Sequence, residues 1–203
     1  MDPYLRMEVK FDRGISLPGC GVWFDAGRKQ KFAVVTHAHS DHAAWHAETV
    51  LTPATAALMA ARLGKPRGHV HEMAYHQPFH FAAGQITLLP AGHVLGSAMA
   101  LLETTGERLL YTGDFKLRQS RTAVPAEIVQ ADRARYQFRC DAAFPLSDHA
   151  DYDELLECVE RVQPKRVYTV HGFVEEFAAD LRRRGVEAWA LGGGNQLELP
   201  LVA

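Results

Sequence analysis

The chain has 203 residues, with 22 Lys and Arg against 24 Asp and Glu, so its formal net charge at pH 7 is −2. Hydrophobic residues make up 47% and charged residues 23% of the chain, which is typical of globular proteins and excludes a disordered chain. The net charge excludes a histone-like basic coat but not a local basic patch. A chain of this length also buries a sizeable core without disulfide bonds.

The cysteines and the first residues predict the compartment. Cys20, Cys140 and Cys158 form no C-x-x-C pair, so we interpret them as free thiols in a reducing environment. Residues 1–14 hold no apolar segment of the kind found in secretory signals, and no apolar run is long enough to cross a bilayer. These features predict a cytoplasmic protein that does not act at a membrane.

Apolar or alternating segments bounded by Gly and Pro predict strands in the first half of the chain. The expected strands are 7–11, 20–27, 31–37, 85–91, 97–104 and 108–114. A helix is expected at 53–63, between Pro53 and Gly64. In the second half, expected helices alternate with expected strands, and Asp151 is the N-cap of the first helix. These elements are 152–163, 166–170, 173–185 and 186–191. The alternation predicts a layered α/β protein.

Residues 116–145 predict no regular element, because they carry scattered arginines and little periodicity. Irregular segments of this length are uncommon within compact domains. We therefore expect a single domain over 1–203 in which this stretch is functional, mobile or the remainder of a larger insertion.

The strongest chemical signal is Thr36-His37-Ala38-His39-Ser40-Asp41-His42, which follows an apolar strand. Four potential metal ligands lie within six residues. If the strand continues into this motif, His37 and His39 point the same way, and Asp41 and His42 lie past the turn, where they can face a second metal. Mixed imidazole and carboxylate ligands suit Zn²⁺, with Mn²⁺ or Fe as alternatives. A solvated histidine-rich loop is the competing interpretation.

Further candidate ligands stand where other predicted strands end. His93, Asp114 and His171 each lie next to a glycine, where the backbone can bend sharply to bring a ligand inward. Each of them alone is equally consistent with a structural histidine or a turn aspartate. In this order after the histidine-rich motif, they indicate a metal centre.

Together these motifs resemble the metallo-β-lactamase fold and, within it, the β-CASP nucleases. They are most similar to the bacterial DNA-ligase-associated exonucleases, also described as mRNA 3′-end processing factor-like. The resemblance covers nearly the whole chain and implies a four-layer αβ/βα sandwich. It also implies two metal sites bridged by Asp114, the first formed by His37, His39 and His93 and the second by Asp41, His42 and His171.

The resemblance assigns further roles around these ligands. Asp25, in Phe24-Asp25-Ala26-Gly27, corresponds to an early aspartate that lies behind the ligands, and we count it with Asp41 among the candidate catalytic residues. Pro145–Asp151 resembles the β-CASP segment whose histidine contacts the scissile phosphate or protonates the leaving group, which makes His149 a candidate general acid. A histidine packed at a helix N-terminus is the alternative for His149.

One departure from the family bears on function. Only 34 positions, residues 115–148, separate Asp114 from His149, where β-CASP nucleases carry an inserted domain. We therefore expect the β-CASP insertion domain to be missing or vestigial. The expected metal ligands lie outside it, but the grip on nucleic acid is weakened because affinity depends on the number of phosphates contacted. Arg133–Arg139 alternates basic and aromatic residues as single-strand binders do, but a solvated connecting loop is the favoured interpretation of this segment.

Two other groups of residues receive structural interpretations. Ser97 has no accompanying residues that would make it a nucleophile. Four further histidines match no motif of the family and are interpreted as structural or surface residues: His69, His71, His76 and His80.

The leading hypothesis is a dinuclear-metal phosphodiesterase that uses a metal-bound hydroxide. A carboxylate bridge with histidines suits hard, oxygen-rich substrates such as phosphodiesters. Several β-lactamases of the fold instead carry a soft Cys thiolate where Asp114 stands. We expect a DNA exonuclease in nucleic-acid processing or repair, acting on DNA rather than RNA beside a DNA ligase or helicase, with two divalent ions and no other cofactor. The alternatives are a small-substrate metallo-hydrolase with an open site and a non-catalytic metal-binding remnant.

Overall fold

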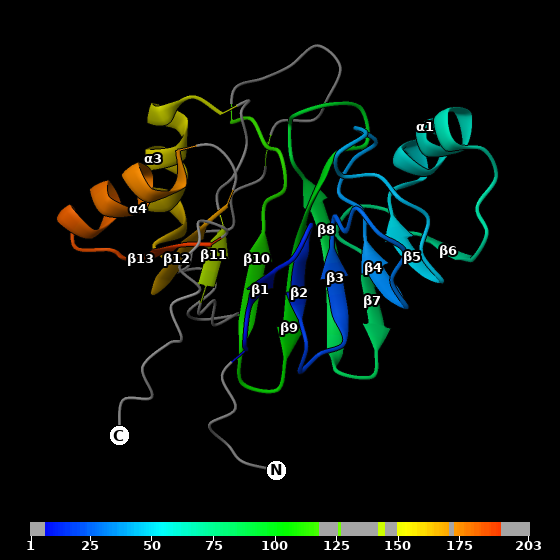
Figure 1. Ribbon diagram of the computed structural model, residues 1–203, viewed down its shortest axis with the longest axis horizontal. Helices are drawn as coiled ribbons and strands as arrows, with labels where there is room; N and C mark the ends of the chain where they lie inside the picture. Colours follow the sequence, from blue (N-terminus) through cyan, green and yellow to red (C-terminus); the bar gives the residue numbers. More distant parts are fainter. Residues whose placement is uncertain (1–6, 118–125, 127–141, 145–149, 171–172, 192–203) are drawn as a thin grey trace.

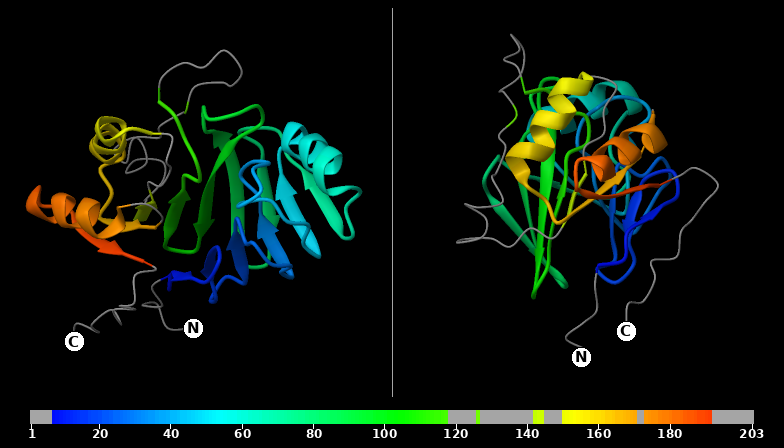
Figure 2. Two further views of the ribbon diagram at one scale, coloured as in Figure 1. Left: turned by 45° about the horizontal axis from the view of Figure 1, so that its top comes forward. Right: turned by 90° about the vertical axis from the view of Figure 1, so that its left-hand side faces the viewer.

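Two β-sheets lie face to face, with helices on their outer faces (Figures 1 and 2). The computed structural model describes residues 7–117, 126, 142–144, 150–170 and 173–191. In this part of the chain, none of the helices has the length and apolar composition that a bilayer-spanning helix needs.

The first sheet holds the N-terminal strands in chain order. These strands are β1 (Lys10–Phe11), β2 (Ile15–Leu17), β3 (Val22–Phe24), β4 (Phe32–Val34), β5 (Glu48–Leu51) and β6 (His69–Glu72). The pairs β1–β2 and β2–β3 are antiparallel, and β3 to β6 run parallel. Because β3 and β4 are parallel, the loops that follow them leave the sheet at the same edge.

The second sheet has the order β13-β12-β11-β10-β9-β8-β7. Its strands are β7 (Pro78–Phe81), β8 (Gly84–Pro90), β9 (Ala98–Thr104), β10 (Arg108–Tyr111), β11 (Ala142–Phe144), β12 (Arg166–Thr169) and β13 (Glu187–Ala190). β7 to β10 are antiparallel neighbours, and β10 to β13 are parallel. The strands β8, β10 and β12 therefore all end at one edge of this sheet.

The core between the sheets follows the two-residue period of the strands. In β9, Ala98, Ala100 and Leu102 face the first sheet and pack with its Phe24. The intervening Met99 and Leu101 belong to a cluster on the opposite face, under a helix. Residues 98–102 of β9 are buried on both faces, which explains why this part of the strand is continuously apolar.

Among the described residues, three helices complete the layers. The helix α1 (Pro53–Leu63) packs on the outer side of the first sheet, where Ala56 and Met59 contact Val35 and Leu51. The helices α3 (Tyr152–Val162) and α4 (Val174–Arg183) pack on the outer side of the second sheet. The order helix, sheet, sheet, helix is the four-layer αβ/βα sandwich expected from the sequence.

Most predicted elements are confirmed, with shorter strands. The helix at 53–63 has the predicted bounds, and Asp151 caps α3 through a reciprocal capping box with Glu154. The strand predicted at 31–37 ends at Val34, so the first two histidines of the motif lie beyond it. Five short strands lie outside the predicted strand ranges: β2, β5, β6, β7 and β11. Of these, β11 lies in the stretch 116–145, for which no element was expected.

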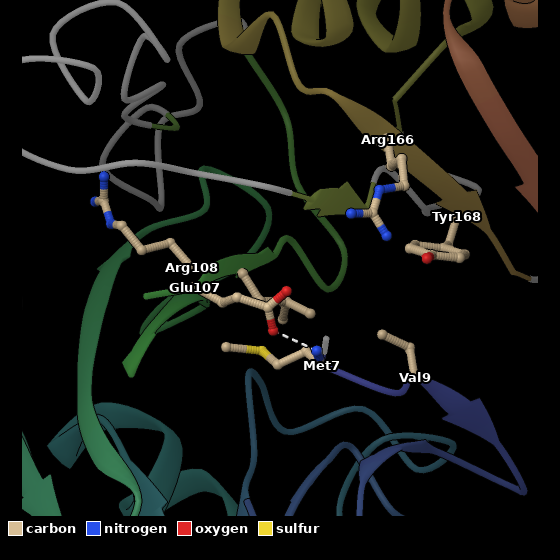
Figure 3. Close-up of a pocket in the computed structure, with 7 residues that line it drawn as sticks. Met7, Val9, Glu107, Arg108, Arg166 and Tyr168 are labelled. Atoms are coloured by element: carbon tan, nitrogen blue, oxygen red, sulfur yellow. Dashed lines mark hydrogen bonds between the residues drawn. The ribbon is translucent and has the colours of Figure 1, made fainter. Parts of the chain in front are cut away.

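The N-terminal segment lies at the edge of the second sheet where β10 and β12 begin, opposite the edge where they end (Figure 3). The backbone N–H of Met7 donates to the Glu107 carboxylate, beside Arg108 and Arg166 at the starts of β10 and β12. The pocket there measures about 10 Å³, which is room for about one water molecule. A ligand site is therefore to be sought where these strands end.

Candidate metal centre

The candidate ligands come from loops that leave both sheets at one edge. The loop after β4 carries His37, His39, Asp41 and His42, the loop after β8 carries His93, and the loop after β10 carries Asp114. The two sheets are tied together here, because the N–H of Ala98 donates to the carbonyl of Thr36. Residues far apart in the sequence thus meet at one site.

Four of these residues form one compact group. Ligand atoms of His37, His39, His93 and Asp114 all lie within 4.8 Å of one another. The Nε2 atom of His93 lies 3.2 Å from Nδ1 of His39, and Oδ2 of Asp114 lies 3.5 Å from Nε2 of His37 and 3.7 Å from Nε2 of His93. Three imidazole nitrogens and one carboxylate oxygen are a donor set that suits a divalent cation such as Zn²⁺.

The other oxygen of Asp114 faces a second set of groups. Its Oδ1 lies 3.7 Å from Nε2 of His42, and that nitrogen lies 3.5 Å from Oδ2 of Asp41. The two carboxylate oxygens of Asp114 therefore face different imidazoles, one on each side. This arrangement suits a carboxylate that bridges two cations.

A buried carboxylate orients His42 from behind. Asp25 is only 4% exposed and accepts hydrogen bonds from the N–H and hydroxyl of Thr36 (2.7 and 2.6 Å) and from the hydroxyl of Tyr111 (3.1 Å). It also lies 3.0 Å from Nδ1 of His42. With Nδ1 bonded to Asp25, the ring turns Nε2 toward Asp41 and Asp114, as carboxylates behind metal-binding histidines do.

Burial and the neighbouring charges shift the pKa values of His37 and His42 in opposite directions. Burial lowers the pKa of His37 to about 3. Burial also opposes the charged form of His42, but the hydrogen bond to Asp25 and the nearby carboxylates outweigh it and raise its pKa to about 9. For Asp25, burial is outweighed by the hydrogen bond and charge of His42, which hold its pKa below the ordinary value.

Ser97, which received a structural interpretation from the sequence, and Thr36, which received no role, shape the ligand loops. The Oγ atom of Ser97 accepts from the N–H groups of His93 (3.2 Å) and Val94 (3.1 Å) and so fixes the His93 turn. Thr36 holds Asp25 and also packs against Gly113, where an added Cβ would lie 2.7 Å from the Thr36 Oγ1. Gly113 has φ +52°, and its missing side chain lets Asp114 approach His37.

A buried nitrogen atom without a hydrogen-bond partner is a second sign that these residues fit a metal. The Nε2 atom of His37 is buried and has no hydrogen-bond partner among the described residues. A buried nitrogen of this kind is costly unless a ligand takes its lone pair. This atom points toward the Asp114 carboxylate at 3.5 Å, which is where a cation shared by the first set would lie.

The remaining candidates divide into two groups. His149 and His171 lie outside the described residues. Among the described residues, His69, His71, His76 and His80 belong to none of the groups that could hold a metal. His69 and His71 instead contact each other on β6, where His71 also lies 3.3 Å from Glu48.

Comparison with known proteins bears on the family and the fold. Residues 136–191 match the family described as the Zn-dependent metallo-hydrolase RNA specificity domain, RMMBL. Over 95% of its length the chain is 33% identical to a protein of Opitutus terrae named "Probable DNA ligase", of which it spans 32%. Over 27% of its length it is 49% identical to the endoribonuclease YSH1 of Mycosarcoma maydis, of which it spans 6%. It also resembles the crystal structure of YhfI from Bacillus subtilis, a metallo-β-lactamase fold protein (12% identical, TM-score 0.55, 80% and 76% of the two chains).

The chain has the metallo-β-lactamase fold, and its residues 136–191 match a family of Zn-dependent metallo-hydrolase domains. The alignment with the Opitutus terrae relative extends over 324 positions but uses only about 193 residues of this chain, 95% of 203. Roughly 130 positions of the relative thus have no counterpart here, an excess of the size of a small domain.

Proposed function

We propose that this protein is a dinuclear-metal phosphodiesterase that removes nucleotides from DNA ends. The observation that carries the proposal is the placement of Asp114, whose two carboxylate oxygens face separate imidazole sets. In the first set, His37, His39 and His93 would hold one cation. In the second, Asp41 and His42 would hold the other, together with His171.

Two Zn²⁺ ions, or Mn²⁺ or Fe, would supply an activated water near neutral pH and would neutralise charge on the phosphate. The protein's own part is to fix these groups before substrate arrives. Asp25 holds the tautomer of His42 through Nδ1, and Ser97 holds the His93 turn. His149 is the proposed proton donor to the leaving oxygen, on the basis of its sequence motif.

DNA is the proposed substrate because the match that covers 95% of the chain is to a protein named as a DNA ligase. The endoribonuclease match covers 27% of the chain. An enzyme that trims ends before joining would act beside a ligase or a helicase, and we place the protein in cytoplasmic DNA repair on this ground. Near-neutral overall charge is compatible with this role, since local fields rather than the total attract nucleic acid.

The test uses end-labelled single- and double-stranded DNA, and RNA of the same sequence, with Zn²⁺ or Mn²⁺. We expect metal-dependent release of mononucleotides from DNA. Asp114→Asn should slow the reaction about 1,000-fold, because a lost metal removes several kcal/mol of stabilisation from the transition state. Asp153→Asn on the exposed face of α3 is the matched control and should not change the rate.

Two outcomes would contradict the proposal. Turnover of bis-p-nitrophenyl phosphate without cleavage of any polynucleotide would identify a small-substrate hydrolase with an open site. Two metals bound per chain with no hydrolysis of any phosphodiester would identify a non-catalytic remnant. Metal content is therefore measured by elemental analysis on each preparation that is assayed.

A further inference from the structure

A cavity of about 270 Å³ adjoins the Asp41–His42 side of the candidate centre. One of its walls is the turn between β1 and β2, which contributes Arg13 and Gly14. Another wall is formed by Asp25, Asp41 and His42. Among the described residues that line this cavity, Arg13 is the one arginine or lysine. A permanent positive charge thus shares a cavity with groups assigned to the second metal.

The Arg13 turn is fixed to the loop that supports His42. The carbonyl of Arg13 accepts a hydrogen bond from the N–H of Gly27 at 2.8 Å. At Gly14, φ is +139° and an added Cβ would lie 2.6 Å from the Cα of Ala26, so the two loops touch backbone to backbone. Since Asp25 precedes Ala26 and binds His42, the base of the Arg13 side chain has a set position beside the second ligand set.

The fold itself does not require an arginine at this position. Arg13 has φ +52°, a left-handed conformation that costs other residues about 1 kcal/mol and that glycine adopts freely. Its side chain is exposed, and no ion pair to a carboxylate is found for it within the part of the chain that the structure describes. A residue that has a strained backbone and lines a cavity beside candidate metal ligands is a candidate for a role in binding.

We propose that Arg13 and this cavity form a subsite for a backbone phosphate that neighbours the scissile phosphate of the polynucleotide. The inference rests on the proposed function and deepens it. A guanidinium binds phosphate through two parallel hydrogen bonds, which a lysine cannot reproduce. The cavity volume lies just below the range of about 300–1,000 Å³ typical of small-molecule sites, which suits one nucleotide unit rather than several.

The test measures binding, so that it does not depend on turnover. The probe is a fluorescent single-stranded DNA with phosphorothioate linkages, which resists cleavage, and its Kd is measured over a series of salt concentrations with Zn²⁺-loaded and with EDTA-treated protein. Arg13→Gly removes the guanidinium and relieves the strained backbone, so it should fold. Arg13→Lys keeps the charge but loses the two-pronged contact. Arg67→Ala, at an exposed arginine after α1, is the control for net charge.

We expect Arg13→Gly to raise Kd about tenfold or more at low salt, as expected for a lost charged hydrogen bond. Its plot of log K against log salt should be less steep by about 0.7, the value for one phosphate contact on a single strand. Arg13→Lys should keep the slope but bind more weakly, and Arg67→Ala should match the wild type. If Arg13→Gly behaves like Arg67→Ala, the subsite is wrong.

The two proposals fail separately in this design. Wild-type protein that binds the probe through Arg13 but releases no nucleotides from DNA overturns the proposed function and supports the subsite. Protein that degrades DNA while Arg13→Gly keeps the wild-type Kd, slope and KM overturns the subsite alone. Protein that does not bind the probe overturns both.

Discussion

The Nδ1 atom of His42 lies 3.0 Å from Oδ2 of Asp25, a carboxylate that is almost completely buried. Asp25 follows β3 and His42 follows β4, and these parallel strands are neighbours in the first sheet. The contact leaves Nε2 of His42 as the atom that faces the proposed second metal. Asp25 thereby connects the hydrophobic core to the candidate centre.

Asp25→Asn should weaken the second metal site more than the first. An asparagine can turn its NH₂ group toward His42, which disfavours the tautomer that presents Nε2, and losses of this kind cost about 10–100-fold in metal affinity. Zinc titration of the EDTA-treated protein by calorimetry should show one nearly unchanged site and one weakened site. Equal weakening of both sites would contradict the orienting role.

Tyr111→Phe tests the support of Asp25 by a hydroxyl. The Tyr111 hydroxyl donates to a buried carboxylate at 3.1 Å, and hydrogen bonds to charged groups contribute about 1.5–3 kcal/mol. Tyr75→Phe is the matched control, because that hydroxyl donates to the neutral carbonyl of Ser97 at 2.9 Å and should cost about 0.5–1.5 kcal/mol. Urea unfolding of the two variants compares the free energies of unfolding, and equal losses would contradict the expected order.

Gly113→Ala should move Asp114 away from His37. The added Cβ would lie 2.7–3.0 Å from three atoms of the Thr36 side chain, so one of the two loops must shift. We expect lower zinc content and a lower melting temperature. Gly106→Ala is the control, because Gly106 also has a positive φ, +102°, but its Cβ would meet nothing within 4 Å. Zinc content that falls equally in both variants would show that backbone strain alone is responsible.

His46 should make stability depend on pH. It is 1% exposed, and burial lowers its pKa to about 4 from 6.5. Between these pH values the unfolded chain binds a proton at this histidine that the folded chain does not, so stability falls as pH drops from 6.5 to 4, by at most about 1.4 kcal/mol per pH unit. His46→Asn keeps an acceptor for the N–H of Gln30, which donates to Nδ1 at 3.1 Å.

The measurement compares free energies of unfolding of wild-type and His46→Asn protein at pH 7.5 and pH 5. The variant should lose less stability over this interval than the wild type. His80→Asn, at an exposed histidine of β7, should lose as much as the wild type. An identical pH dependence in all three proteins would show that another group titrates over this range.

Much of the fold follows from local signals in the sequence. The bounds of α1 follow from Pro53 and Gly64, and the cap of α3 follows from Asp151, because these residues act within one turn of the helix. Strand ends were less predictable. The strand before His37 ends at Val34, since pairing with neighbouring strands rather than composition decides where a ladder stops. Short strands such as β2 and β11 carry too few residues to show a period.

The sequence by itself predicted the candidate ligands from the spacing of histidines and aspartates at strand ends, because ligand type and local periodicity are properties of short segments. Only the tertiary structure decided which oxygen of Asp114 faces which imidazole, that Asp25 stands behind His42, and that Arg13 shares a cavity with them. Those relationships join residues from different strands and both sheets. They are set by sheet pairing and by close backbone contacts, which no single segment encodes.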